Sequence, residues 1–171
     1  GVLREATAAE DAAHPYSTIV GTASDSKAHE QAAELVHSVL PGAPSAITCT
    51  STEAEIIKYA QNVSGYIDII TFNVFYDIAQ KLGADWKPIL KAMQADPNIP
   101  SRFANPVHKT GRGAGGHCLI KDMAALRWFY EQIFGEDAGS TFLRSAEEKN
   151  KQLLKSTKKD LNLLMGVYGN E

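Results

Sequence analysis

Cysteine is scarce in this chain of 171 residues, which has only Cys49 and Cys118. Two cysteines are too few for a disulfide framework and are typical of proteins in a reducing, cytoplasmic compartment. The sequence also lacks a CxxC pair and any cluster of His and Cys with the spacing of metal ligands. We therefore expect a cytoplasmic protein without a metal site.

Long apolar runs and massed positive charge are lacking as well. No apolar segment approaches the roughly 18–20 residues that cross a bilayer. The charged residues Arg4, Glu5, Glu10 and Asp11 interrupt the start, where a signal peptide would be apolar. The net charge is −3 and the basic residues are spread out, which disfavours a general nucleic-acid binder. With 44% apolar and 22% charged residues, we expect a soluble globular protein with no membrane or nucleic-acid partner.

The start of the sequence has the pattern of one βαβ unit. Residues 17–22 and 46–50 are short β-rich runs, and residues 26–40 between them have apolar residues at helical spacing after a Ser26 cap. Such a unit needs neighbouring strands to cover it. We therefore interpret residues 1–51 as the tail of a larger α/β domain whose earlier part is missing from this sequence.

A long helix is predicted next, over residues 52–82. Thr52 and Glu55 have the spacing of a capping box, and Gly83 has the usual position of a glycine after a helix end. A helix of this length is about 45 Å long at 1.5 Å per residue. Its apolar residues occur around most of its circumference, which is typical of a helix at the centre of a bundle or in a dimer interface.

Shorter helices are predicted for the remainder. They cover residues 86–94 after an Asp85 cap, residues 121–134 and residues 141–165, and a proline- and glycine-rich loop occupies residues 96–116. The expected fold is mainly α, a helical bundle around one long central helix, preceded by a small α/β remnant.

A glycine-rich loop leads to the second cysteine, because residues 111–122 read GRGAGGHCLIKD. Glycines let a backbone approach a ligand closely, and a cysteine at a helix start faces amides that favour the reactive thiolate. The alternative is a flexible turn before a small buried hydrophobic residue, the commoner environment of a single cysteine. The Lys121-Asp122 pair that follows favours a reactive site.

Lys58 and Asn62 are one turn apart on the predicted long helix and so share a face. Lysine is rarely buried without a partner or a task. The alternative is that Lys58 lies near enough to the helix start for its ammonium group to reach water. These two residues alone leave both interpretations open.

Three motifs, taken in order, resemble those of the UDP-glucose/GDP-mannose dehydrogenase family. They are LRE-x-TA-x-x-D-x-x-x-P at residues 3–15, E-x-x-K-x-x-x-N at residues 55–62 and G-x-G-G-x-C-x-x-K-D at residues 113–122. The resemblance implies that residues 1–51 end an NAD-binding Rossmann domain. It also implies that residues 52–171 form a central helical domain for dimerisation and substrate binding. No glycine-rich fingerprint opens the βαβ unit, so NAD would be bound mainly by the missing N-terminal domain.

The resemblance also implies a reaction, in which NAD takes two hydrides from C6 of a UDP- or GDP-hexose and the alcohol becomes a carboxylate. Cys118 would attack the intermediate aldehyde, giving a thiohemiacetal and then a thioester. Lys58 and Asn62 would stabilise the oxyanion at C6. Asp122 would orient water or assist proton transfer, and Glu5 would position the water that hydrolyses the thioester.

Further residues take binding roles by the same resemblance. Lys121 would lie near the cofactor, and Arg102 would reach into the partner subunit's substrate site in a homodimer formed through residues 52–82. The backbone of the glycine loop would contact the sugar at Gly113, Gly115 and Gly116.

Some positions depart from the family pattern. Gly1 stands where the family has a catalytic glutamate, and His117 replaces the commoner serine, as in relatives that act on UDP-N-acetyl-hexosamines. Those relatives have Val-Asp-Pro where this chain has residues 121–123, Lys-Asp-Met, so the sugar stays open.

Two other classes of protein compete with this interpretation. A non-catalytic helical dimerisation or binding module derived from the family is one, and the intact set of Lys58, Asn62, Cys118 and Asp122 disfavours it. The 3-hydroxyacid and 6-phosphogluconate dehydrogenases share a long helix with K-x-x-x-N, but they do not need a cysteine after the glycines. Without an NAD site, the isolated chain is expected to be inactive.

Overall fold

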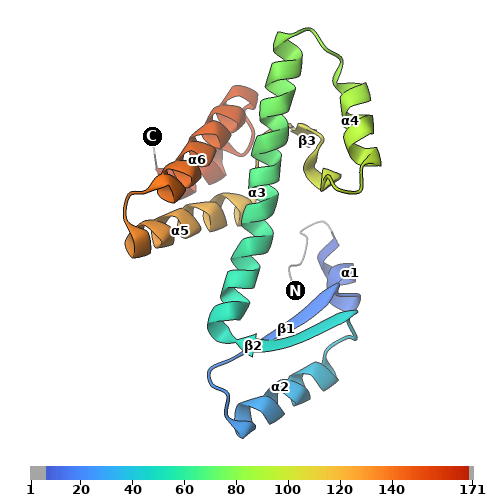
Figure 1. Cartoon of the computed structure of the whole chain (residues 1–171), viewed down its shortest axis with the longest axis vertical. Helices are drawn as coiled ribbons and strands as arrows, with labels where there is room; N and C mark the ends of the chain where they lie inside the picture. Colours follow the sequence, from blue (N-terminus) through green and yellow to red (C-terminus); the bar gives the residue numbers. More distant parts are fainter. Residues whose placement is uncertain (1–6, 170–171) are drawn as a thin grey trace. The chain divides into compact units, whose positions relative to one another are not determined.

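Residues 7–169 are described by the computed structural model, which is mainly helical with a small parallel sheet (Figure 1). The chain divides into two compact units, residues 1–60 and residues 61–171. The expected mainly α fold with a small α/β part is confirmed. The domain boundary predicted after residue 51 stays a prediction.

The first unit contains the predicted βαβ arrangement. After a short helix α1 (Ala8–Ala13), strand β1 (Ser17–Thr22), helix α2 (Lys27–Val39) and strand β2 (Ser45–Thr50) follow in order. β1 and β2 pair in parallel, from Ser17 opposite Ser45 to Thr22 opposite Thr50. Ser26 caps α2 as predicted, because the amide of His29 donates to its hydroxyl oxygen.

The long helix α3 (Ser51–Lys81) begins directly after β2. The predicted capping box at Thr52 and Glu55 is wrong, because the helix starts one residue before Thr52. The amide of Glu53 donates to Thr50 Oγ1 at 3.2 Å, and the amide of Thr50 donates to Glu53 Oε2 at 2.8 Å. The same T-x-x-E spacing occurs at residues 50–53 and 52–55, and the structure uses the earlier pair.

The end of α3 agrees with the prediction. Gly83 adopts a φ of 68°, the left-handed conformation that glycine tolerates best. The amide of Ala84 donates to the carbonyl of Ala79 at 2.8 Å and that of Gly83 to the carbonyl of Gln80 at 3.2 Å. This pair of bonds is a Schellman motif, which satisfies carbonyl groups at the helix end.

The second unit begins within α3 and continues with α4 (Trp86–Ala95), which Asp85 caps by accepting a hydrogen bond from the amide of Lys87. The region predicted as a plain loop contains a short 3-10 helix η2 (Ser101–Phe103) and two paired segments, β3 (Val107–His108) and β4 (Gly111–Arg112). β3 and β4 run antiparallel. The glycine loop therefore leaves the end of a short hairpin.

Two predicted helices differ from the structure. α5 (His117–Phe134) begins four residues before the predicted start at residue 121. The helix predicted over 141–165 is two helices, α6 (Ala138–Thr157) and α7 (Leu161–Tyr168). Lys158 and Asp160 adopt positive φ angles of 55° and 50° and so interrupt the helix. Apolar residues recur on both sides of this turn, so the spacing alone predicted a single helix.

Helices α5 and α6 lie side by side and share the core of the second unit with α3 (Figure 1). The largest buried cluster joins residues of these helices and of the glycine loop: Val63, Tyr66, Ile70, Ala114, Met123, Leu143, Ala146 and Leu153. Among residues 7–169, no helix has the length and apolar character that a membrane crossing requires. The packed core of this unit fixes the segments that carry the candidate site.

Candidate functional site

A buried polar cluster joins α3 to α5. Asn62 of α3 donates from Nδ2 to Oδ2 of Asp122 at 2.5 Å, and Lys121 donates from Nζ to Oδ1 of the same carboxylate at 2.5 Å. Asp122 is 1% exposed and Asn62 is 9% exposed, although they are far apart in the sequence. A carboxylate is rarely this deeply buried unless its oxygens are paired. The structure thus brings together three of the residues that the sequence analysis selected.

Cys118 lies in the first turn of α5 and is exposed. It precedes Asp122 by four residues, so the thiol and the carboxylate lie on one side of the helix. The alternative of a small buried hydrophobic residue therefore does not describe Cys118 in this chain. Cys49 in β2 is half-buried.

The glycine loop between β4 and α5 is held by side chains from α6 and from the turn after it. Asn150 makes two hydrogen bonds to the backbone of Ala114, accepting from its amide at 2.7 Å and donating to its carbonyl at 2.9 Å. Lys159 Nζ donates to the carbonyl of Gly113 at 2.8 Å. The amide of Gly116 donates to Oδ2 of Asp160 at 2.8 Å.

The glycines of this loop allow close packing against that part of the chain. A Cβ atom on Gly113, which has a φ of 90°, would lie 2.8 Å from Oδ1 of Asn150. A Cβ atom on Gly115 would clash with Asp160 and would lie 2.8 Å from Cε of Lys159. Gly116 has a φ of 79° and open space in the Cβ direction, so here the backbone angle alone favours glycine.

Gly111, Gly113 and Gly116 happen to have the G-x-G-x-x-G spacing of a dinucleotide fingerprint. That fingerprint works at the first turn of a parallel βαβ unit. β4 instead pairs antiparallel with β3. The turn after β1, at residues 23–26, reads Ala-Ser-Asp-Ser and lacks glycine. Neither segment therefore fits the pyrophosphate of NAD.

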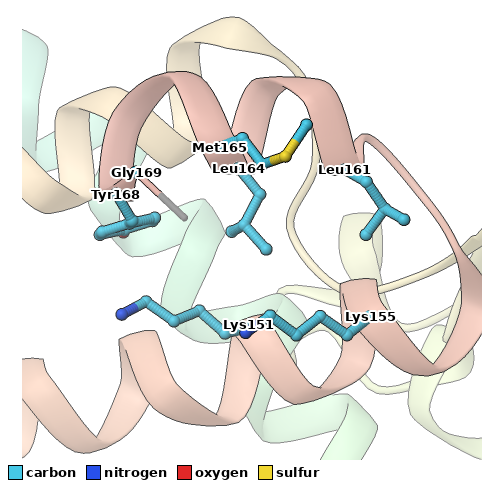
Figure 2. Close-up of a pocket in the computed structure, with 7 residues that line it drawn as sticks. All are labelled: Lys151, Lys155, Leu161, Leu164, Met165, Tyr168 and Gly169. Atoms are coloured by element: carbon cyan, nitrogen blue, oxygen red, sulfur yellow. The ribbon is translucent and has the colours of Figure 1, made fainter. Parts of the chain in front are cut away.

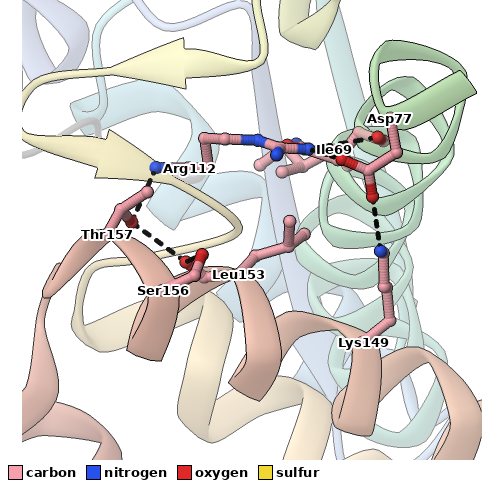
Figure 3. Close-up of polar contacts among 8 residues, drawn as sticks. Ile69, Asp77, Arg112, Lys149, Leu153, Ser156 and Thr157 are labelled. Atoms are coloured by element: carbon pink, nitrogen blue, oxygen red, sulfur yellow. Dashed lines mark hydrogen bonds and ion pairs between the residues drawn. The ribbon is translucent and has the colours of Figure 1, made fainter. Parts of the chain in front are cut away.

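An ionic network fixes the hairpin that precedes the loop (Figure 3). Asp77 of α3 forms ion pairs with Arg112 of β4 and with Lys149 of α6, each at 2.6 Å. Arg112 also donates from Nε to Oδ1 of Asn73 at 2.8 Å and from its amide to Thr157 Oγ1 at 3.1 Å. α3, β4 and α6 are thus joined beside the glycine loop.

The pKa values of two groups around the loop are shifted. Burial would raise the pKa of Asp77, but the hydrogen bonds and charges of Lys149 and Arg112 outweigh burial and hold that pKa below its usual range. Burial lowers the pKa of Lys159, which is 4% exposed. The hydrogen bond from the Lys159 amino group to the carbonyl of Gly113 therefore compensates for the hydration that this amino group loses on burial.

Two further predicted site residues, Lys58 and Arg102, are exposed. Lys58 belongs to the first unit and is exposed, with its ammonium group 5.1 Å from the centroid of the Tyr59 ring. Arg102 of η2 is exposed and lies over Phe103. Glu5 is outside the described residues. Within residues 7–169, no group of three or more His, Cys, Asp or Glu side chains could hold a metal ion.

A small cavity of about 290 Å³ lies between α6 and α7 (Figure 2). Figure 2 shows the long side chains of Lys151 and Lys155 facing the apolar side of α7 across it. Its lining residues are Lys151, Lys155, Leu161, Leu164, Met165, Tyr168 and Gly169. The predicted site residues are not among them, so this cavity is separate from the candidate site.

The sequence analysis missed Asn150, Lys159 and Asp160. A signal for Asn150 was present, because it interrupts the apolar stripe of α6 formed by Leu143, Ala146 and Leu153. An amide on the buried face of a helix needs hydrogen-bond partners. Lys159 and Asp160 carried no such signal, since both fell inside the helix predicted over 141–165.

Comparisons with known proteins agree with this arrangement. Residues 52–152 match the model of the UDP-glucose/GDP-mannose dehydrogenase family, central domain. The chain is 34% identical to the UDP-glucose 6-dehydrogenase YwqF of Bacillus subtilis, over 98% of this chain and 36% of that protein. It is 30% identical to the UDP-glucose 6-dehydrogenase of Rickettsia conorii, over 88% of this chain and 32% of that protein.

A solved structure is similar as well. A UDP-glucose dehydrogenase from the archaeon Pyrobaculum islandicum superposes with a TM-score of 0.71 at 28% identity, over 86% of this chain and 32% of that one. The chain thus spans about a third of the length of these relatives. With more than half of its residues matched by the family model, the chain belongs to the UDP-glucose/GDP-mannose dehydrogenase family.

Proposed function

We propose that this chain is the central part of an NAD-dependent dehydrogenase that oxidises the C6 alcohol of a nucleotide-linked hexose to a carboxylate. The observation that carries the proposal is the arrangement on α5. An exposed cysteine in its first turn stands one turn before a buried aspartate, and an asparagine from α3 is bonded to that aspartate. Nucleophile, carboxylate and amide donor are the groups that aldehyde oxidation through a covalent intermediate requires.

In this proposal Cys118 provides the covalent step. The first hydride transfer leaves an aldehyde at C6, and the Cys118 thiolate adds to its carbonyl carbon to form a thiohemiacetal. Loss of the second hydride and of the hydroxyl proton leaves a thioester. Water then cleaves the carbon–sulfur bond, which releases the carboxylate and restores the thiol. The difficult oxidation of an aldehyde is thereby divided into easier steps.

Asn62 and Asp122 act around the same carbon. One of the two N–H groups of the Asn62 amide is bonded to Asp122, which fixes the plane of the amide. The other N–H donates to the oxyanion that develops on C6, together with the Lys58 ammonium group. Asp122 also serves as the proton acceptor or as the orienting group for water, and Glu5 assists hydrolysis.

NAD would accept the two hydrides and would be held mainly by a domain outside this sequence, with Lys121 near it. The family relationship supports a nucleotide sugar as the substrate, bound by the loop at Gly113, Gly115 and Gly116. Arg102 is exposed on η2, as a side chain that reaches a partner subunit must be. We propose a cytoplasmic homodimer formed through residues 52–82.

The test uses the full-length protein that contains this chain. NADH formation and carboxylate product are measured with UDP-glucose, a UDP-N-acetyl-hexosamine and GDP-mannose. Carboxylate from one of these sugars, lost when Asp122 is replaced by Ala, supports the proposal. Binding of a nucleotide sugar without any NADH would favour the alternative of a binding module that has lost catalysis.

A further inference from the structure

The turn between α6 and α7 has two residues with positive φ angles and a buried lysine between them. Lys158 and Asp160 both have positive φ angles, a conformation that is strained for a residue with a side chain. Lys159 between them is 4% exposed. A conformation of this kind persists only where the surrounding contacts determine it. Those contacts are made to the glycine loop.

Three side chains hold backbone groups of Gly113, Ala114 and Gly116 in that loop. Asn150 accepts from the amide of Ala114 and donates to its carbonyl. Lys159 donates to the carbonyl of Gly113, and Asp160 accepts from the amide of Gly116. Asn150 and Lys159 are buried, so water competes little for their bonds. The loop is therefore fixed on the side that faces α6.

The last of these contacts lies next to the proposed nucleophile. Gly116 is the N-cap residue of α5, and Cys118 follows it by two residues. The position of Gly116 sets where α5 starts and therefore where the thiol points. Small displacements of a reacting group have large effects on rate, on the order of 100-fold for about 1 Å.

We propose that Asn150, Lys159 and Asp160 are positioning residues, which hold the glycine loop so that the first turn of α5 presents Cys118 to the substrate. This inference rests on the proposed role of Cys118 as the nucleophile. None of the three side chains touches the reacting atoms in this scheme. They act through the loop backbone.

Asp160 offers the sharpest test, because two replacements tolerate its positive φ. Asp160→Gly removes the acceptor for the Gly116 amide, whereas Asp160→Asn keeps an acceptor oxygen in the same place. Both replacements remove the negative charge, so a difference between the two variants measures the effect of the hydrogen bond from the Gly116 amide. Lys158→Gly is the matched control for added flexibility in the turn.

Three readouts are compared across these variants. In the 171-residue chain, the rate of iodoacetamide reaction at Cys118 is followed with Cys49 as the internal reference, and hydrogen exchange is followed in the peptide that contains residues 113–118. In the full-length enzyme, kcat and KM are measured. Asp160→Gly should slow Cys118 alkylation, speed exchange of the loop amides and lower kcat by roughly 10- to 100-fold with a smaller change in KM. Asp160→Asn and Lys158→Gly should stay near wild type.

The proposal is overturned if Asp160→Gly loses thermal stability but keeps the wild-type alkylation rate and kcat, since the contact would then be only structural. If Asp160→Gly does not fold, Lys159→Met replaces it, because methionine fills the same space without the donor to Gly113. A different result would show that the proposed function itself is wrong. In that case Cys118→Ser would still form carboxylate, whether or not Asp160→Gly changes hydrogen exchange in the loop.

Discussion

At the scale of single residues, Asp122 is the buried carboxylate of the candidate site. It accepts hydrogen bonds from Asn62 and Lys121 while 1% exposed. Lys121 is half exposed, so its ion pair contributes little to stability. The bond from Asn62 is shielded from water, and its loss leaves a buried amide without its acceptor.

Asp122→Ala should therefore lower the free energy of unfolding by about 1–3 kcal/mol. Lys121→Ala should lower it by less than about 1 kcal/mol. Urea unfolding of the 171-residue chain measures both. Equal losses for the two variants would mean that the contact between Asn62 and Asp122 contributes no more than the ion pair at the surface.

Asp77 gives the chain a dependence on pH. Its pKa is lowered in the folded state, so its ion pairs stabilise the fold above the unfolded-state pKa of about 3.9, and this stability is lost as the pH falls through the lower folded-state pKa. Asp77→Asn should unfold at a lower temperature than wild type near neutral pH. The difference should close as the pH falls below about 4. A difference that stays constant with pH would contradict the role assigned to the carboxylate.

At the scale of elements, local signals predicted helix ends well where a cap is a short-range motif. Ser26, Asp85 and Gly83 were all identified from the sequence and all act as expected. The start of α5 and the break after α6 depend instead on contacts between distant segments. Gly116 meets Asp160 across more than forty residues of chain, and a local pattern contains no information about such a contact.

The same division applies to the candidate site. Motifs located Asn62, Lys121 and Asp122, and the structure brings these three together. The side chains that hold the glycine loop come from a region without a motif. The choice between two overlapping capping boxes could not be made from spacing either, because it depends on where β2 ends.

That choice can be tested directly. Thr50→Ala removes the hydroxyl that accepts from the amide of Glu53, and it should cost about 1 kcal/mol of stability. Thr52→Ala lies inside the helix and should cost less, because alanine is the better helix former. Thermal unfolding of the two variants decides between the boxes. A larger loss of stability for Thr52→Ala than for Thr50→Ala would instead favour the capping box predicted at residues 52–55.

At the scale of the whole molecule, much apolar surface is uncovered. One stripe along the last turns of α3 and the residue after its end carries large side chains at 42–78% exposure, namely Val74, Phe75, Ile78 and Leu82. In the first unit, Leu35 and Val39 of α2 are 65% and 72% exposed. Contiguous apolar surface of this kind marks places where other protein surfaces bind. It supports the proposals that α3 meets a partner subunit and that the βαβ unit belongs to a larger domain.

Light scattering should therefore give a mass near twice 18.5 kDa for this chain. Phe75→Glu places a charge on the exposed stripe and should yield a folded monomer, because the side chain is 53% exposed and is not needed for the core. Gln80→Glu, on another side of α3, should remain a dimer. A wild-type monomer at low micromolar concentration would count against the proposed interface.

The central claim is that Cys118 carries the second oxidation, and the yield of NADH per sugar in the full-length enzyme tests it most directly. Wild type should form two NADH for each sugar converted to the carboxylate. Cys118→Ser should stop after one round, with at most two NADH per active site and no free carboxylate, because oxidation of the serine hemiacetal leaves an ester that hydrolyses far less readily than a thioester. A serine variant that forms two NADH per sugar at the wild-type rate would show that Cys118 is not the nucleophile.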